Sequence, residues 1–231
     1  MNVASAARGQ LAGLKACITC SAGLQPRRAR RRLAVVLGLA VCLSGGWSCR
    51  QASTPTPEAR EAAYRANNRG VSLLEQFAYG PAVEAFHEAL KLDPSLRLAR
   101  INLPIALFYA GRTAEAAEQA RATSHAYPDA PQPPFILGLI ARLDNQPDEA
   151  AKAFRSVLQL DPDDVGSKVN LALTSMQERK YQEAVELSRS ALTLEPYNAT
   201  AAYNLSLALT RTGDTAAGAR ALQQLDRKSV V

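Results

Sequence analysis

Apolar side chains recur at helical spacing along residues 61–231. In four stretches they fall at positions i and i+4, with position i+7 on the same face of a helix. These stretches begin at Ile101, Phe135, Val169 and Tyr203, and each begins 34 residues after the one before. Other apolar residues of the same stretches, such as Leu103 and Leu107, lie on a second face. A helix that is apolar on two faces is buried on both or presents an apolar groove.

Prolines mark the same period. Pro94, Pro128, Pro162 and Pro196 are each 34 residues apart without an insertion. Proline lacks the amide hydrogen and disfavours helix in the residue before it, so each one predicts the end of a helix. Gly111, Asn145 and Gly213 lie where a preceding helix must end, a position typical of a left-handed cap residue.

Small and bulky residues also recur at fixed distances before the prolines. The small column is Ala82, Ala116, Ala150 and Ala184, and the other column is Phe86, Ala120, Phe154 and Ser188. Small residues let two antiparallel helices approach closely, and bulky ones fill the space between successive helix pairs. The pattern therefore predicts a series of packed helix pairs.

These columns resemble the tetratricopeptide repeat, a helix-turn-helix unit with the same period of about 34 residues. The resemblance implies an all-α fold, a solenoid of antiparallel helix pairs over residues 61–231. Four repeats are complete, and a fifth stops within its final positions; they span 63–96, 97–130, 131–164, 165–198 and 199–231. One pair cannot bury its apolar face alone, so stacking supplies the core.

The second and third repeats depart from this pattern. Pro104 stands inside a predicted helix, where it costs on the order of 3 kcal/mol unless the helix kinks. The segment APQPPF, residues 130–135, delays the next helix until about Pro133. We expect a local bend of the solenoid here.

Asparagines form a further column of the first helices. Its members are Asn68, Asn102, Asn170 and Asn204, with Ile136 in the third repeat. Asparagine is a poor residue for a helix interior, so its recurrence needs a reason. The resemblance implies that this column faces a concave groove, where the amides could bind the backbone of an extended peptide. The alternative is that they serve the repeat scaffold through local hydrogen bonds.

The neighbouring positions predict the character of such a groove. Its expected apolar lining is Ile101, Ile105, Phe108, Phe135, Leu139, Val169, Leu173, Tyr203 and Leu207, with Arg142, Met176 and Thr210 at the corresponding i+7 positions. Lysine and arginine are absent from the positions where chaperone-binding relatives clamp a terminal carboxylate, so that subclass is not expected. The alternative is that these residues pack against another part of the solenoid or against a separate domain.

The charge lies mostly at the beginning of the chain. The first 48 residues hold seven basic residues and no acid, whereas the remaining 20 basic and 21 acidic residues nearly cancel. Binding to nucleic acid needs a basic face on the folded part, so the sequence gives no support for a nucleic-acid partner.

Residues 1–49 have the plan of a leader. An arginine-rich block precedes an apolar run at 33–43 and small residues before Cys49, as in an export signal. The run is short for a membrane span, which needs roughly 20 residues. Cys49 is a candidate for lipidation, with simple cleavage or an uncleaved anchor as alternatives. We expect an exported protein, periplasmic or membrane-anchored in a bacterium, with a flexible Ser/Thr/Pro linker at 50–60.

No constellation of catalytic residues is present in the sequence. His87 and His125 are the only histidines, and all four cysteines lie in the first 49 residues, where Cys17 and Cys20 have a CxxC spacing without further support. No phosphate-binding loop or nucleophile motif is present. We therefore expect no enzyme, no cofactor and no metal site.

Two functions fit this sequence. The first is an interaction scaffold that binds a peptide or protein segment in an apolar, Asn-lined groove outside the cytoplasm. The second is a subunit or fragment that serves a separate catalytic or propeller module. The chain resembles, more loosely, the tetratricopeptide segment that precedes FG-GAP propeller repeats in some exported bacterial proteins, and the stop at Lys228-Ser-Val-Val231 favours that alternative.

Overall fold

The computed structural model describes residues 54–228, and within this range the only regular elements are helices. Ten of them form five consecutive pairs: α2 (Pro57–Glu75) with α3 (Tyr79–Leu92), α4 (Arg97–Tyr109) with α5 (Thr113–Ala126), α6 (Gln132–Leu143) with α7 (Pro147–Leu160), α8 (Val165–Gln177) with α9 (Tyr181–Leu194), and α10 (Ala199–Arg211) with α11 (Thr215–Lys228). The predicted all-α solenoid of helix pairs is confirmed. Residues 1–53, which include the predicted leader and Cys49, lie outside the described residues.

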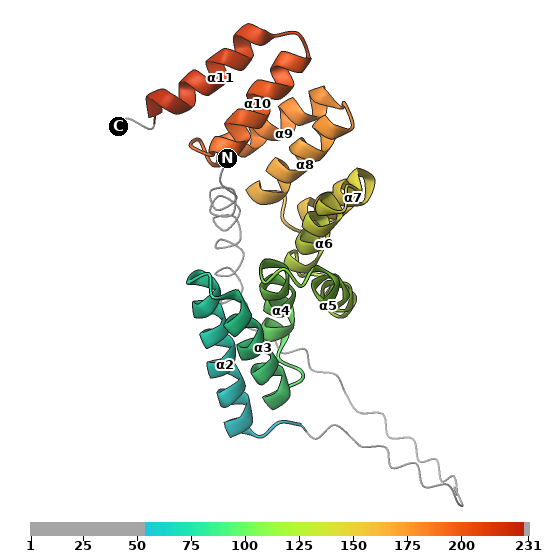
Figure 1. The fold of residues 1–231 in the computed structure, drawn as a ribbon, viewed down its shortest axis with the longest axis vertical. Coiled ribbons are helices and arrows are strands. Elements are labelled where there is room, and N and C mark those ends of the chain that lie inside the picture. The colour runs from blue at the N-terminus through green and yellow to red at the C-terminus, as the bar shows by residue number, and fades with distance from the viewer. Residues whose placement is uncertain (1–53, 229–231) are drawn as a thin grey trace, which may run out of the picture.

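The pairs stack in chain order from α2 and α3 at one end to α10 and α11 at the other (Figure 1). The four aligned prolines all lie in the connections between one pair and the next, as predicted. The first helices of successive pairs contact one another along the whole stack, α2 with α4, α4 with α6, α6 with α8 and α8 with α10. We call the surface made by these five first helices the inner face.

The first helix begins earlier than the sequence indicated. Thr56 is its N-cap, and the Thr56 hydroxyl accepts a hydrogen bond of 3.2 Å from the Ala59 amide. Pro57 occupies the first turn, where its missing amide hydrogen has no cost, and Glu58 lies near the positive end of the helix. The predicted linker at 50–60 therefore has to be corrected at its end, because residues 57–60 are helical.

The core is built by phenylalanine rings that pack onto glycines. Phe86 and Phe154 are completely buried in the second helices of the first and third pairs. A Cβ atom added to Gly70 or Gly138, on the paired first helices, would lie 2.6 Å from the Cε1 atom of the facing ring. The ring thus occupies the space that any larger residue would need, which is why glycine and phenylalanine recur together.

The turn between the two helices of each pair uses a left-handed residue. Gly111, Asn145 and Gly213 have φ values of 78°, 55° and 97°, as the sequence predicted. The structure adds Phe77 and Arg179, both with φ of 61°, at the same position of the first and fourth repeats. The repeat geometry imposes this conformation even where the residue is not suited to it.

Replacing Arg179 with glycine is therefore expected to raise the free energy of unfolding by about 0.5–1 kcal/mol, because glycine adopts positive φ without steric cost. Urea denaturation measures the change. Arg179→Ala keeps the steric cost and serves as the matched control. If both variants changed stability equally, the strain at this position would not be the cause.

Helix α4 continues through Pro104, which is buried within it. Proline has no amide hydrogen to donate to the carbonyl of Arg100, four residues earlier. The hydroxyl of Thr123 in α5 donates to that carbonyl at 3.2 Å. A side chain of the paired helix thus satisfies the carbonyl that the proline leaves free. Helix α6 begins at Gln132, within one residue of the start at about Pro133 that the sequence predicted. The predicted bend of the solenoid stays a prediction.

Thr123→Val is expected to lower the free energy of unfolding by about 1–3 kcal/mol, since it leaves the Arg100 carbonyl without this donor. Valine preserves the shape of the buried side chain, so packing changes little. Thr193→Val is the control, because the exposed Thr193 hydroxyl donates to Arg189 of its own unbroken helix. An equal effect of the two substitutions would contradict this role of Thr123.

Candidate functional site

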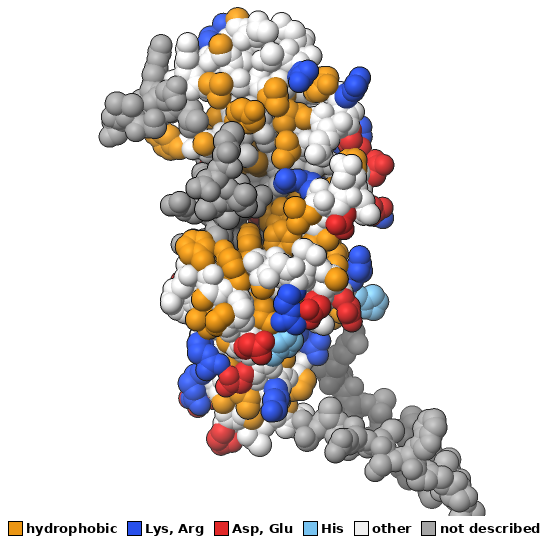
Figure 2. Space-filling view, viewed as in Figure 1, with side chains coloured by type: hydrophobic (Ala, Val, Ile, Leu, Met, Phe, Trp, Pro, Cys, Tyr) orange, Lys and Arg blue, Asp and Glu red, His pale blue; other side chains and the backbone are white. Residues whose placement is uncertain are grey.

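The inner face divides the predicted groove residues into two groups. Ile101, Ile105, Phe135, Leu139 and Val169 are buried and belong to the packing between the helices. Phe108, Leu173 and Leu207 are half-buried, and Tyr203 is exposed. In the view of Figure 2, hydrophobic side chains gather along the middle of the molecule, and charged ones lie mainly at its right edge and lower end.

The accessible part of the inner face consists of residues in the middle and last turns of the first helices. Its half-buried members include Val71 of α2, Phe108 of α4, Leu173 and Met176 of α8, and Leu207 of α10. These residues occupy two sets of equivalent positions in the repeat, so they form a discontinuous apolar row along the stack. Such a row can contact every second or third side chain of an extended segment that runs across the helices.

Three of the four predicted asparagines are buried, and all three hold first helices together. Asn102 Nδ2 donates to Asn67 Oδ1 at 3.2 Å, which joins α4 to α2. Asn204 Nδ2 donates to the Val169 carbonyl at 3.2 Å, which joins α10 to α8. The fourth predicted member, Asn68, is exposed, and its Oδ1 accepts from Asn67. The scaffold alternative thus has direct structural support, while ligand contact by these amides stays a prediction.

Asn170 joins α6 to α8 in a different way. Its Nδ2 donates to the Gly166 carbonyl of its own helix at 2.8 Å, and its Oδ1 accepts from Nη1 of Arg142. At the remaining junction, between α4 and α6, the column holds Ile136, which is completely buried. Hydrophobic packing replaces the amide there.

Arg142 lies on the last turn of α6 and is half-buried. Burial lowers its pKa, because removing the guanidinium from water disfavours the charged form. Among the described residues, no carboxylate lies within ion-pair distance of this guanidinium. The inner face therefore holds a charge whose protein partner is a neutral amide.

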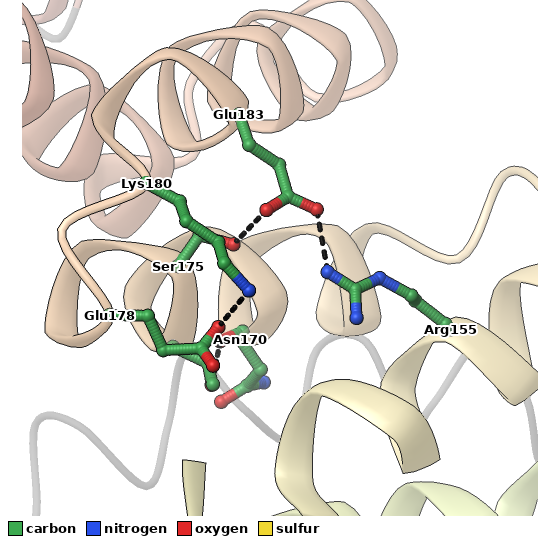
Figure 3. Close-up of polar contacts among 7 residues, drawn as sticks. Arg155, Asn170, Ser175, Glu178, Lys180 and Glu183 are labelled. Atoms are coloured by element: carbon green, nitrogen blue, oxygen red, sulfur yellow. Dashed lines mark hydrogen bonds and ion pairs between the residues drawn. The ribbon is translucent and has the colours of Figure 1, made fainter. Parts of the chain in front are cut away.

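A polar network lies where the third and fourth pairs meet (Figure 3). Glu183 of α9 accepts from Arg155 of α7 at 2.8 Å and from the Ser175 hydroxyl of α8 at 3.0 Å. Burial raises the pKa of Glu183, but the hydrogen bonds from Arg155 and Ser175 outweigh it and leave the pKa below its usual range. The buried Ser175 stands where leucine occupies the first, second and fifth repeats, so this contact is specific to one junction.

This network also lies at a division in the core. Buried apolar residues of α2 to α7 form one cluster that reaches Leu171 of α8. A second cluster, which includes Ala172, Ala184 and Leu209, belongs to α8, α9 and α10. The partly buried Leu187 packs against both clusters, and the link between Arg155 and Glu183 adds a polar connection at the same junction.

Two features of the inner face could not be predicted from the sequence. Asn67 is buried and accepts from Asn102, although the asparagine column pointed to its neighbour Asn68. Arg142 was placed in the groove by its spacing, but its contact with Asn170 required the arrangement of α6 against α8. The sequence did mark Arg142 as unusual, because no other first helix has a charged residue at this position of the repeat. The equivalent residues are Leu74, Phe108, Met176 and Thr210.

The described residues offer little for other chemistry. His87 and His125 are both exposed, on α3 and α5. Among the side chains that the structure describes, no group of three or more from His, Cys, Asp and Glu could hold a metal ion. None of the described helices has the length and apolar character needed to cross a membrane.

The family model for the tetratricopeptide repeat matches residues 105–165 and 169–229, together more than half of the chain. The chain belongs to the tetratricopeptide repeat family. Proteins of this family generally mediate protein–protein interactions.

Solved structures agree on the fold. The chain is similar to MamA 41-end from Desulfovibrio magneticus RS-1, with 17% identity, a TM-score of 0.62, and coverage of 73% of this chain and 97% of that one. A structure of Pseudomonas aeruginosa pilF matches with 19% identity and a TM-score of 0.66, covering 74% of this chain and 78% of that one. At these identities the similarity establishes the arrangement of helix pairs.

Proposed function

We propose that this tetratricopeptide repeat protein is a non-enzymatic scaffold that binds an extended peptide or protein segment along its inner face. A row of half-buried apolar side chains at repeating positions of the first helices supports this function; it includes Phe108, Leu173 and Leu207. A row in register with the repeat suits a ligand that crosses the helices in extended form, because its side chains also recur at a regular spacing.

The exposed Tyr203 extends this row on α10. More than half of its surface, 58%, is accessible, although it lies on a first helix between buried positions. Aromatic side chains of this kind are enriched among residues that dominate the affinity of protein interfaces. We infer that Tyr203 contacts the ligand, whereas the buried Asn102, Asn170 and Asn204 set the spacing of the first helices beneath it.

The experiment that tests this function is a selection of random twelve-residue peptides, displayed on phage, against the full chain. Affinities of the selected peptides are then measured by fluorescence polarisation. Tyr203→Ala is expected to weaken binding about tenfold, as for an interface aromatic residue. Tyr197→Ala, which removes a tyrosine that is 66% exposed in the connection before α10, is the matched control and should bind normally.

Failure to select any peptide, or equal affinity of wild type and Tyr203→Ala, would contradict binding at this part of the inner face. Equal losses in both tyrosine variants would place the binding surface near the connection between α9 and α10 instead.

We also propose that the protein is exported and held at a membrane by a lipid on Cys49. The support is the order of the leader, in which an arginine block precedes an apolar run and small residues before the cysteine. Metabolic labelling with a radioactive fatty acid should mark the wild-type protein and leave Cys49→Ser unlabelled. An unlabelled wild type would leave cleavage without lipidation as the better account.

A further inference from the structure

In the last four pairs, charge is distributed unequally between the first and the second helices. The first helices α4, α6, α8 and α10 contain no Asp or Glu and five basic residues: Arg97, Arg100, Arg142, Lys168 and Arg211. The second helices of these pairs carry acids, for example Glu115 and Glu118 on α5. These four first helices are therefore mainly apolar and carry only positive charge, which is complementary to an acidic ligand.

Arg142 differs from most of these cations in its surroundings. Arg97 contacts Asp129 at 2.8 Å, and Lys168 lies 3.8 Å from Asp163. Arg142 is half-buried in the middle of the stack and donates to the neutral Asn170 side chain, with no carboxylate partner among the side chains that the structure describes. Withdrawing a cation from water is unfavourable unless an opposite charge compensates it.

We propose that the Arg142 guanidinium binds the carboxylate of an Asp or Glu side chain within the extended segment that occupies the inner face. This inference rests on the proposed function and names the chemistry of its ligand. The Nη1 atom of Arg142 donates to Oδ1 of Asn170, and this bond fixes the position of the guanidinium. The other N–H groups of the guanidinium are left for the ligand. Two parallel hydrogen bonds from a fixed guanidinium fit a carboxylate better than any neutral acceptor.

The residues around Arg142 define the rest of the ligand. Leu139 precedes it by one turn on α6, and Phe108 and Met176 hold the equivalent positions on α4 and α8. Both flanking side chains are half-buried and apolar, so the residues on either side of the ligand's acid should be apolar too. The recognised pattern is thus a single acidic residue between apolar ones, bound along the chain rather than at a terminal carboxylate.

The test uses the displayed twelve-residue peptides as its probe. Selection against the full chain should enrich peptides with an Asp or Glu between apolar residues, whereas selection against Arg142→Met should enrich apolar peptides without that acid. For one selected peptide, exchange of its acid for the matching amide should weaken binding to wild type about tenfold or more, and binding to Arg142→Met about twofold or less. Arg142→Lys should recover part of the preference.

Arg211→Met is the matched control, since Arg211 lies exposed on a first helix and its loss lowers the general positive charge equally. It should keep the full preference for the acidic peptide. If Arg142→Met weakened the acidic and the amide peptide equally, Arg142 would only position Asn170, and the inference would be wrong. Peptides selected without any acidic residue would overturn the inference alone, whereas no selected peptide at all would overturn the proposed function.

Discussion

Phe154→Ala is expected to lower the free energy of unfolding by about 3–5 kcal/mol, as for a large aromatic side chain removed from a closely packed core. Phe154 is completely buried on α7, where its ring lies 5.8 Å from that of Phe135 and covers Gly138 of α6. Glycine cannot move a side chain into the space that the ring leaves, so the cavity would persist. Urea denaturation followed by circular dichroism measures the loss.

Leu143→Ala is the control. Leu143 is the last residue of α6, in the same helix pair, and 66% of its surface is exposed. Its truncation should change stability by about 0.5 kcal/mol or less. A loss of under about 1 kcal/mol for Phe154→Ala would mean that the pair repacks around the missing ring, and would contradict a rigid core between α6 and α7.

Gly138→Ala is expected to cost about 1–3 kcal/mol, although alanine is the better helix former. The added Cβ atom would lie 2.6 Å from Cε1 of Phe154, so the ring or the whole of α7 must shift. The same denaturation experiment measures the change in the free energy of unfolding.

Gly80→Ala is the matched substitution at a helical glycine without neighbours, since nothing lies within 4 Å of a Cβ atom added there. It should leave stability unchanged or raise it by up to about 1 kcal/mol. If Gly138→Ala were as well tolerated as Gly80→Ala, close packing would not be the reason for glycine in the third repeat.

The pairing of the helices could be predicted from the sequence because its determinants are local or periodic. The aligned prolines end second helices whatever their surroundings, and Gly111 and Gly213 permit the left-handed turn. Phe77 and Arg179 adopt the same turn against their own preference, which no local rule predicts. The early start of α2 was also missed, because proline-rich composition indicated a linker while Thr56 and Pro57 acted as a cap.

The candidate site was less predictable than the fold. Periodicity shows on which face of a helix a residue lies, but not how deeply its side chain is buried. Ile105 and Leu173 hold equivalent positions on α4 and α8, yet the first is buried and the second half-buried. The difference depends on how closely neighbouring helices approach. For the same reason, the asparagines could be placed on the inner face, but their bonds between helices, such as Asn204 to Val169, could not be foreseen.

The location of a bound peptide tests binding at the inner face most directly. A selected peptide with a benzophenone group at its centre is crosslinked by light to the full chain, and the modified residues are mapped by mass spectrometry. A peptide bound along the inner face should give adducts on the first helices α4, α6, α8 and α10. Adducts confined to the second helices α3, α5, α7 and α9 would contradict binding at the inner face.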